Sequence, residues 1–191
     1  VVTDTGRMKM LFKGRAIVDI SREFLNTNGV KQTADAEICD RVTDWFDKKT
    51  GTDFVKETKK ALSDLNVCAK KGLSETFDST IGARSVYMPW GGRNQLTPAI
   101  AMAAKICGDE TDVCTVSAYG YSPYLMETSP FVGTIYSIVA SVSKVVATGA
   151  RYEDIRLTLQ EFFERMTSDK KVWGVPASAL LGAVYAQIGL S

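Results

Sequence analysis

The chain has 191 residues, of which 45% are hydrophobic, and its 23 basic and 22 acidic residues leave a formal net charge of +1. This size and composition predict one domain with a sizeable core, or a domain with an attached piece. The near-neutral charge excludes an electrostatic case for binding nucleic acid or an anionic membrane.

The first third of the chain predicts a hairpin followed by two helices. "KMLFKGRAIVDI" (9–20) has the pattern of two short strands around Lys13-Gly14, and Asn28-Gly29 marks a stop. A first amphipathic helix is predicted from the spacing of Ile38, Val42, Trp45 and Phe46. A second begins near Thr52 as its N-cap, with an inward face of Phe54, Thr58, Leu62 and Leu65. Both helices look like a surface connector.

The rest of the chain alternates predicted strands and helices, which gives an α/β (α+β) fold class. Strands are predicted at "RSVYM" (84–88) and "DVCTVSAY" (112–119), and a helix at 99–107 after Thr97-Pro98. Ser129-Pro130 begins a helix of about 18 residues that stops at Gly149. Two more helices are expected at "EDIRLTLQEFFERM" (153–166) and "PASALLGAVYAQIG" (176–189). The last one is predicted to have a core stripe of Leu180, Leu181, Val184, Tyr185 and Ile188, and its several small residues permit close helix packing. With so few strands, the predicted sheet is incomplete.

The cysteines and the missing histidines limit the chemistry. Cys39, Cys68, Cys107 and Cys114 are widely spaced, without any C-x-x-C motif, and the chain has no histidine. This pattern argues against a zinc site and a disulfide framework, and favours reduced thiols in the cytoplasm. Ser-His and Cys-His nucleophile systems are excluded. No run of about 18 apolar residues occurs, so no membrane span is expected.

Two short motifs allow phosphate chemistry without requiring it. No P-loop and no G-x-G-x-x-G is present. Gly91-Gly92-Arg93 can form an anion-binding nest, but a simple glycine turn is the favoured interpretation. Asp78-Ser79-Thr80 can ligate Mg²⁺ or a ribose, or can form an Asx turn. The aromatic stretch Tyr119–Tyr124 can stack a base, although rigid packing of an aromatic turn is favoured.

Three segments together resemble the phosphoribosylformylglycinamidine synthase family, the amidotransferases of purine synthesis: "FDSTIGARSVYMPWGGRNQLTP", "YGYSPYLMETSPF" and "VVATGARYEDIRLTLQEFFERM". The resemblance implies an incomplete aminoimidazole-ribonucleotide-synthetase-like fold. Residues 1–37 would be the tail of a first synthetase half, 38–74 a helical connector, and 75–191 a truncated N-terminal domain of the second half. Strand 84–88 would join the sheet through which the two halves pair.

The resemblance also implies site residues. Asp78, Thr80 and Gly82 match the family's acid-x-Thr-x-Gly element, Gln95 and Pro98 a following Gln/Pro element, Glu127 and Pro130 a Glu-x-x-Pro element, and Asp154 a later acid. The nucleotide-binding candidates are Asp78, Thr80, Gly82, Gly92, Arg93, Gln95 and Lys144. Ala140 and Lys144 occupy positions where family members carry metal ligands, and an acid is missing near Ala101. No metal ligand or catalytic residue is therefore assigned, and Lys144 is expected to meet a phosphate directly.

The implied cofactors are ATP and Mg²⁺, used by the full-length parent and not held by this segment alone. The implied partners are the first synthetase half and a glutaminase domain. Because the chain begins with Val1 and stops before a "GKDS"-like loop, it is expected to be a fragment, inactive by itself and prone to self-association. The alternative is a free-standing, non-enzymatic binding or scaffold module, expected to be a well-behaved monomer.

Overall fold

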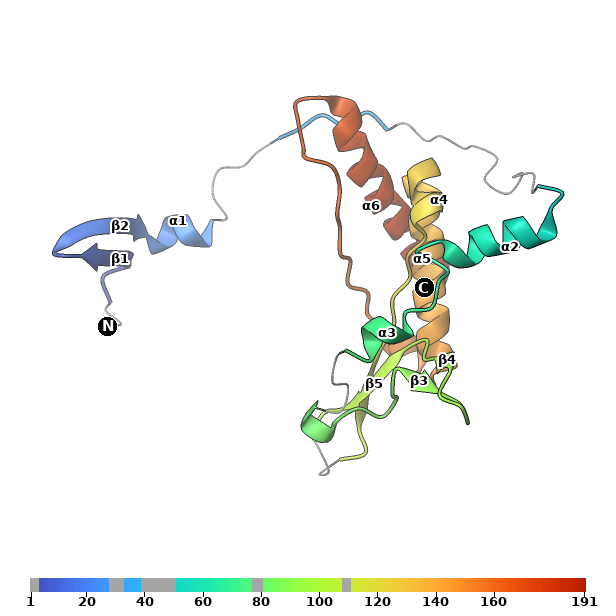
Figure 1. The fold of residues 1–191 in the computed structure, drawn as a ribbon. Coiled ribbons are helices and arrows are strands. Elements are labelled where there is room, and N and C mark those ends of the chain that lie inside the picture. The colour runs from blue at the N-terminus through green and yellow to red at the C-terminus, as the bar shows by residue number, and fades with distance from the viewer. Residues whose placement is uncertain (1–3, 28–32, 39–50, 77–80, 108–110) are drawn as a thin grey trace. The chain divides into compact units, whose positions relative to one another are not determined.

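The computed structural model describes residues 4–27, 33–38, 51–76, 81–107 and 111–191, and the chain divides into two compact units, Val1–Asp35 and Ala36–Ser191 (Figure 1). The first unit is a hairpin of β1 (Arg7–Phe12) and β2 (Arg15–Ser21), followed by the short helix α1 (Arg22–Asn26). Lys13 and Gly14 both have positive φ, 48° and 77°, as a tight hairpin turn of this hand requires. The predicted hairpin is confirmed, whereas Asn28-Gly29 lies outside the described residues.

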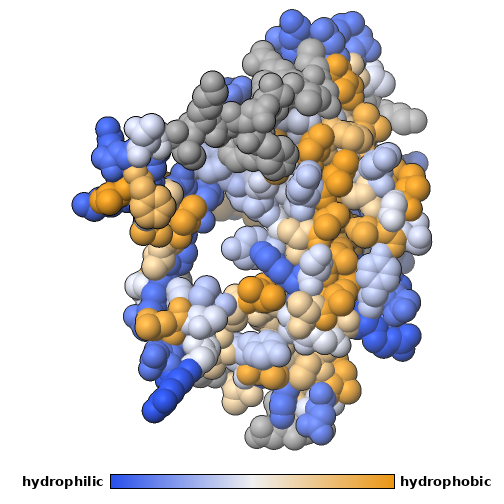
Figure 2. All heavy atoms as spheres, turned by 90° about the vertical axis from the view of Figure 1, so that its right-hand side faces the viewer, coloured by the Kyte–Doolittle hydropathy of each residue, from blue (hydrophilic) through white to orange (hydrophobic). Residues whose placement is uncertain are grey.

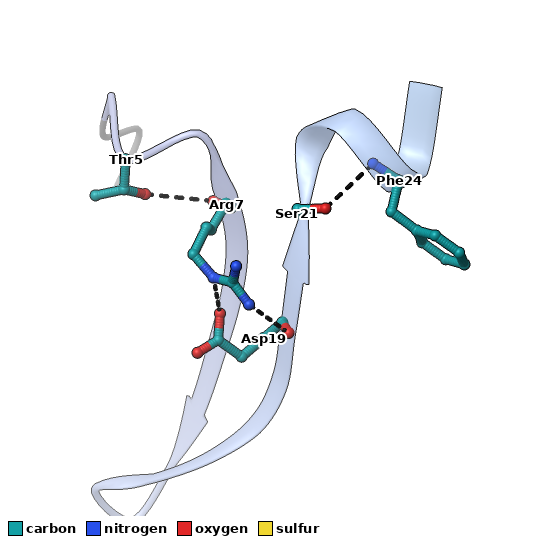
Figure 3. A network of polar contacts seen from close by, with 5 residues as sticks. All are labelled: Thr5, Arg7, Asp19, Ser21 and Phe24. Atoms are coloured by element: carbon teal, nitrogen blue, oxygen red, sulfur yellow. Dashed lines mark hydrogen bonds and ion pairs between the residues drawn. The ribbon is translucent and has the colours of Figure 1, made fainter. Parts of the chain in front are cut away.

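The hairpin is held by polar contacts across its open end (Figure 3). Arg7 Nε donates to Asp19 Oδ1 at 2.5 Å and Arg7 Nη2 donates to the Asp19 carbonyl at 3.0 Å. Ser21 caps α1 by accepting from the Phe24 amide at 3.2 Å. Because the Arg7 guanidinium donates to its carboxylate, the pKa of Asp19 lies below its ordinary value of 3.8. Every described side chain of β1 is exposed, so these polar contacts do not enclose a core.

The second unit begins with a connector that is less buried than predicted. Helix α2 (Phe54–Ser63) has Asp53, not Thr52, as its N-cap, with Asp53 Oδ1 accepting from the Lys56 amide at 3.1 Å. The inward face predicted for this helix is wrong, because Phe54 is 81% and Leu65 82% exposed. Most of the first predicted helix lies outside the described residues, and α3 (Lys71–Ser74) follows.

Short antiparallel pairs replace the single sheet that was expected. After a 3₁₀ turn, η2 (Ile81–Ala83), strand β3 (Trp90–Gly91) pairs with β4 (Thr97–Pro98), and β5 (Met102–Lys105) pairs with β6 (Cys114–Ser117). The helix predicted at 99–107 is therefore wrong: the backbone of β5 is paired along both sides, which overrides the helix preference of its alanines.

Both predicted strands, 84–88 and 112–119, are confirmed in part. Strand β6 confirms the core of the segment predicted at 112–119. At the start of the predicted strand 84–88, the Val86 amide donates to the Ala103 carbonyl and the Lys105 amide to the Arg84 carbonyl, each at 2.8 Å. These bonds pair only the first residues of "RSVYM" with β5, through an isolated bridge between Ser85 and Ala104.

The core lies between the long helices α5 (Pro130–Ala147) and α6 (Lys170–Leu190), with the short helix α4 (Pro123–Thr128) before them. Helix α5 confirms the predicted length of 18 residues, and Ser129 caps it by accepting from the Val132 amide at 3.2 Å. The core cluster consists of Ile138, Val142, Ala183 and Ala186. A Cβ on Gly182 would lie 2.4 Å from the Phe131 carbonyl oxygen, so the two helices approach as closely as glycine permits.

The large residues of α6 lie on its outer face, contrary to the prediction that they form its core stripe. Its buried face consists of small residues, Gly174, Ser178, Ala179, Gly182, Ala183 and Ala186. The exposed residues are Leu180, Leu181, Val184, Tyr185 and Ile188. Figure 2 shows hydrophobic residues, in orange, at the surface on the side that it presents. The close helix packing predicted from the small residues is confirmed, and it explains why the larger ones point outward.

No helix forms at 153–166, where one was predicted. A single 3₁₀ turn, η3 (Tyr152–Asp154), is followed by an extended stretch without regular structure up to Asp169 (Figure 1). Ile155 and Leu157 are partly buried while Arg156 and Thr158 are exposed. This alternation has the period of a strand, and it prevails because one face of the segment lies against the helices.

Helices and strands together are compatible with the predicted α+β class, and no more specific fold follows from them. By length and composition alone, α5 and α6 could each cross a membrane, contrary to the expectation from the sequence. This is weak support for a membrane protein, because the core helices of soluble proteins pass the same test. Here the two helices contact each other through their buried faces.

Candidate functional site

The glycine-arginine motif forms the loop between β3 and β4. Gly92 has a φ of +80° and Gln95 a φ of +49°, and the Gln95 amide donates to the Gly92 carbonyl at 3.1 Å. Arg93 lies between them and is exposed. The loop is therefore a turn closed by the Gln95 amide, and an anion-binding role for Gly91-Gly92-Arg93 stays a prediction.

Lys144 lies on α5, where its charge is directed at the turn after β6. Its Nζ donates to the Tyr119 carbonyl at 3.0 Å and lies 4.6 Å from the centroid of the Tyr119 ring. Both contacts favour a cation at this position. A phosphate that met Lys144 directly, as the sequence suggests, would have to share the ammonium group with this carbonyl.

The structure does not gather the seven nucleotide-binding candidates into one site. Asp78 and Thr80 lie outside the described residues. Gly82, with a φ of +79°, belongs to the turn η2, and Gly92, Arg93 and Gln95 share the β3–β4 loop. Among the described residues, no hydrogen bond or ion pair joins that loop to Lys144 or to Gly82. The binding role of these residues stays a prediction.

The remaining motif residues have structural contacts. The carboxylate of Asp154 lies 3.6 Å from Arg151 Nε, at the surface. Glu127 is exposed on α4, whereas Pro130 is buried at the start of α5. Across the described ranges, no three Cys, Asp or Glu side chains form a group that could hold a metal ion.

The turn "YGY" between β6 and α4 lies against helix α5. A Cβ on Gly120 would be only 1.7 Å from the Ser137 carbonyl oxygen, so no other residue fits here without moving the turn. Tyr119 and Tyr121, on either side, are 75% and 65% exposed. The favoured interpretation of these rings as packing residues is wrong for both, since the turn itself packs through its glycine.

A groove of about 1230 Å³ runs beside this turn, between α5, β6 and the extended segment after η3. Its α5 wall carries the hydroxyls of Thr134, Ser137 and Ser141. Ser137 and Ser141 donate to helix carbonyls within α5, at 2.8 Å each. Thr134 Oγ1 is buried without a hydrogen-bond partner in the described part of the chain. The spacing of the three hydroxyls along one helix face is visible in the sequence, but their facing a groove is not.

A polar contact that the sequence gave no sign of joins α4 to the end of α2. The Tyr124 hydroxyl donates to Asp64 Oδ2, and the Asn66 amide donates to Asp64 Oδ1 at 2.8 Å. The bond from Tyr124 is the main cause that lowers the pKa of Asp64 below 3.8, and the same bond raises the pKa of Tyr124 above 10.0. The contact fixes the end of the connector helix on α4.

Comparison with known proteins gives one informative similarity. No protein-family model matches the chain, and no solved structure matches it. The chain is 26% identical over 153 residues to the phosphoribosylformylglycinamidine synthase subunit PurL of Thermoplasma acidophilum. The match covers 78% of this chain and 20% of that protein, so the chain spans about a fifth of the length of its relative. This is distant homology to a PurL subunit, at an identity too low to carry residue roles across.

Proposed function

We propose that this chain is a segment of an ATP-dependent ligase of purine synthesis that converts formylglycinamide ribonucleotide to the corresponding amidine, with glutamine as the amide donor. The similarity to PurL carries the proposal, because it covers 78% of this chain. In this proposal, residues 1–37 end a first synthetase half, 38–74 connect the halves, and 75–191 begin the second half.

The exposure of apolar side chains in the described parts supports a segment with neighbours in a larger protein. Phe162 is 95% exposed, and Leu65 on the connector is 82% exposed. Exposed apolar surface of this kind is typical of faces that other parts of a protein cover. The proposed neighbours are the first synthetase half and a glutaminase domain that would supply ammonia.

In the reaction, the formamide oxygen would attack the γ-phosphorus of ATP, which releases ADP and forms an iminophosphate. Ammonia would then add to the carbon and displace inorganic phosphate to give the amidine. Such phosphoryl transfer depends on Mg²⁺ and on positioned donors that stabilise the charge on the phosphoryl oxygens. In this segment, Arg93 in its exposed loop and Lys144 on α5 are the described cations among the candidates. We assign them a supporting contact with a phosphate, and place the metal ligands and the reacting groups in the rest of the synthase.

The test is an assay of the complete reading frame that encodes this segment. The purified product should consume ATP in the presence of formylglycinamide ribonucleotide and ammonia, whereas the 191-residue chain alone should show no turnover. In the complete protein, Arg93→Ala should raise the KM for ATP. Arg22→Ala, which makes the same substitution at the exposed start of α1, is the control and should leave the KM unchanged. Absence of synthase activity in the complete protein would refute the proposal.

The free-standing binding module remains the competing function, and the outer face of α6 is the feature that favours it. Leu181, Tyr185 and Ile188 are each more than half exposed on that helix. Size-exclusion chromatography with ATP-binding measurements on the complete product separates the two functions. A module would be a monomer without affinity for purine nucleotides, whereas a synthase would bind ATP.

A further inference from the structure

Strand β6 has a free edge, and the backbone groups that point to this edge can be assigned. In β5, the backbone groups of Ala103 and Lys105 bond the segment that precedes β3, so they point away from β6. The residue between them pairs with Thr115 of β6, whose backbone groups therefore point to β5. Alternation along the strand leaves those of Cys114 and Val116 at the free edge, where no described strand pairs with them.

The extended segment 155–159, called the strap below, lines the same groove as β6. In the described part of the chain, residues 156–159 form no backbone hydrogen bond. Amide and carbonyl groups left unpaired in this way favour pairing with another strand. The groove therefore has unpaired backbone on two of its sides, one on β6 and one on the strap.

The side chains of β6 and of the strap alternate in the same way. Ile155 and Leu157 pack against the core cluster that includes Ile138 of α5, and Val116 lines the groove together with Ile138. The half-buried positions are Val116, Ala118, Ile155 and Leu157, and the exposed ones are Thr115, Ser117, Arg156 and Thr158. Both segments therefore direct their inner faces at α5, as neighbouring strands of one sheet do.

We propose that the strap closes this groove by pairing parallel with the free edge of β6, with α5 as the helix of the crossover. Parallel neighbours need a long connection, which is usually a helix packed on the sheet. The chain from β6 to Ile155 contains α4 and α5, so the connection has this form. Closure adds a strand to the β5–β6 pair and buries Leu159, which is 48% exposed beside the open groove.

One register keeps every inner position apolar. In it, the neighbours on the inner face are Cys114 and Ile155, Val116 and Leu157, and Ala118 and Leu159. A shift of two residues one way places Glu161 beside Ala118, and a shift of two the other way extends the pair into the 3₁₀ turn η3 at Asp154. A shift of one residue places Arg156 or Thr158 on the inner face.

The ladder also has defined ends in this register. A Cβ on Gly120 would lie 1.7 Å from the Ser137 carbonyl oxygen, so the chain after β6 is held on α5 and cannot continue the strand. Glu161, the next residue with inner parity, then has no neighbour on β6 and stays exposed, as does Phe162. At the other end, η3 precedes the strap. The pairing is thus limited to 155–159 by the local structure on both sides.

The first test is a disulfide scan on the 191-residue chain with its four native cysteines replaced by alanine. In the proposed register, Ser117 and Thr158 are neighbours on the outer face, and Cα atoms about 5 Å apart allow a disulfide. With oxidised glutathione, Ser117→Cys combined with Thr158→Cys should cross-link within one chain, as detected by mass spectrometry of a non-reduced digest. The matched controls combine Ser117→Cys with Arg156→Cys or with Gln160→Cys, and should cross-link at least about fivefold more slowly.

The second test is hydrogen exchange by NMR on the wild-type chain, which needs no substitution. In the proposed register, the Arg156 amide donates to the Cys114 carbonyl and the Thr158 amide to the Val116 carbonyl, whereas the Leu157 amide points away from β6. The amides of Arg156 and Thr158 should therefore exchange at least about tenfold more slowly than that of Leu157.

Three results would overturn the proposal: no cross-link between the cysteines at 117 and 158, equal cross-linking rates in the three paired variants, or equal exchange of the three strap amides. If the cysteine variants do not fold, the exchange pattern of the wild type decides by itself. The proposal does not rest on synthase activity, and a failure here leaves the proposed function untouched.

Discussion

Tyr124 and Asp64 lie 60 positions apart in the chain, yet their hydrogen bond determines how both titrate. Replacing Tyr124 with phenylalanine removes the strongest donor to Asp64 and leaves the Asn66 amide bonded at 2.8 Å. The pKa of Asp64 should therefore rise but stay below 3.8. Carboxyl ¹³C NMR titration of the variant checks this, and Tyr121→Phe, which keeps the Asp64 contacts, is the control.

The directions of the Asp64 and Tyr124 pKa shifts determine how the contribution of this contact to folding stability changes with pH. The lowered pKa of Asp64 means that the contact stabilises the fold above pH 3.8 and that this contribution is lost as pH falls through the lowered pKa. The raised pKa of Tyr124 means that its contribution is complete below pH 10.0 and is lost as pH rises further. An Asp64 titration that is identical in the variant would show that the hydroxyl does not reach the carboxylate in solution.

At the scale of single residues, local signals were predictable and distant pairs were not. The Lys13-Gly14 turn and the Ser129 cap depend on neighbours within three positions, and both follow from residue type. The Tyr124 contact depends on how α4 meets the end of α2, which no local pattern encodes. The cap of α2 was misplaced by one residue because Thr52 and Asp53 are both good N-caps.

The N-cap of α5 is a feature of the helix whose contribution can be measured. Ser129 is 4% exposed, and its hydroxyl accepts from the Val132 amide. Replacing Ser129 with alanine should cost about 1 kcal/mol of unfolding free energy, measured by urea denaturation. Ser143→Ala on the exposed face of the same helix removes a hydroxyl that bonds only the Val139 carbonyl, and should cost much less. Equal losses in the two variants would contradict a capping role.

The contact of α5 with α6 depends on glycine at one position. A side chain at Gly182 would collide with the Phe131 backbone at 2.4 Å, so Gly182→Ala should destabilise the helix pair by about 1–3 kcal/mol. Gly189→Ala on the same helix meets nothing within 4 Å and should stabilise by about 0.5–1 kcal/mol through the backbone. Thermal melting followed by circular dichroism compares them, and a stabilised Gly182→Ala variant would show that the helices are further apart.

Helices and strands were predicted correctly where the sequence carried the signals of only one of the two. Helix α5 has a cap, a proline at its start and a continuous apolar stripe, and its length was predicted correctly. The segment 153–166 carries apolar residues whose spacing fits both a helix and a strand. It is extended because one of its faces packs against the helices α5 and α6. The inner face of α6 was misjudged because large residues were expected in the core, whereas close helix contact requires small ones.

At the scale of the whole molecule, the candidate site could be predicted only as a set of residues, not as a place. Arg93 and Gln95 meet in one loop, while Lys144 is bonded to Tyr119 on another element. Asp78 and Thr80 lie outside the described residues. A nucleotide site built from such separate pieces depends on contacts between elements, and in the proposed synthase also on parts of the protein beyond this chain. Residue type and spacing carry neither kind of information.

The two units should differ strongly in local stability. A two-stranded hairpin whose side chains are exposed is marginally stable alone, whereas α5 packs its buried residues Ile138 and Val142 on α6. Hydrogen exchange measured by mass spectrometry should therefore show amides of β1 and β2 exchanging at least about a hundredfold faster than those around Ile138. Equal protection would mean that the hairpin is held by a larger sheet, as the tail of a first synthetase half would be. In the proposed complete synthase, by contrast, the same measurement should show the hairpin protected, because neighbouring parts of the protein would cover both strands.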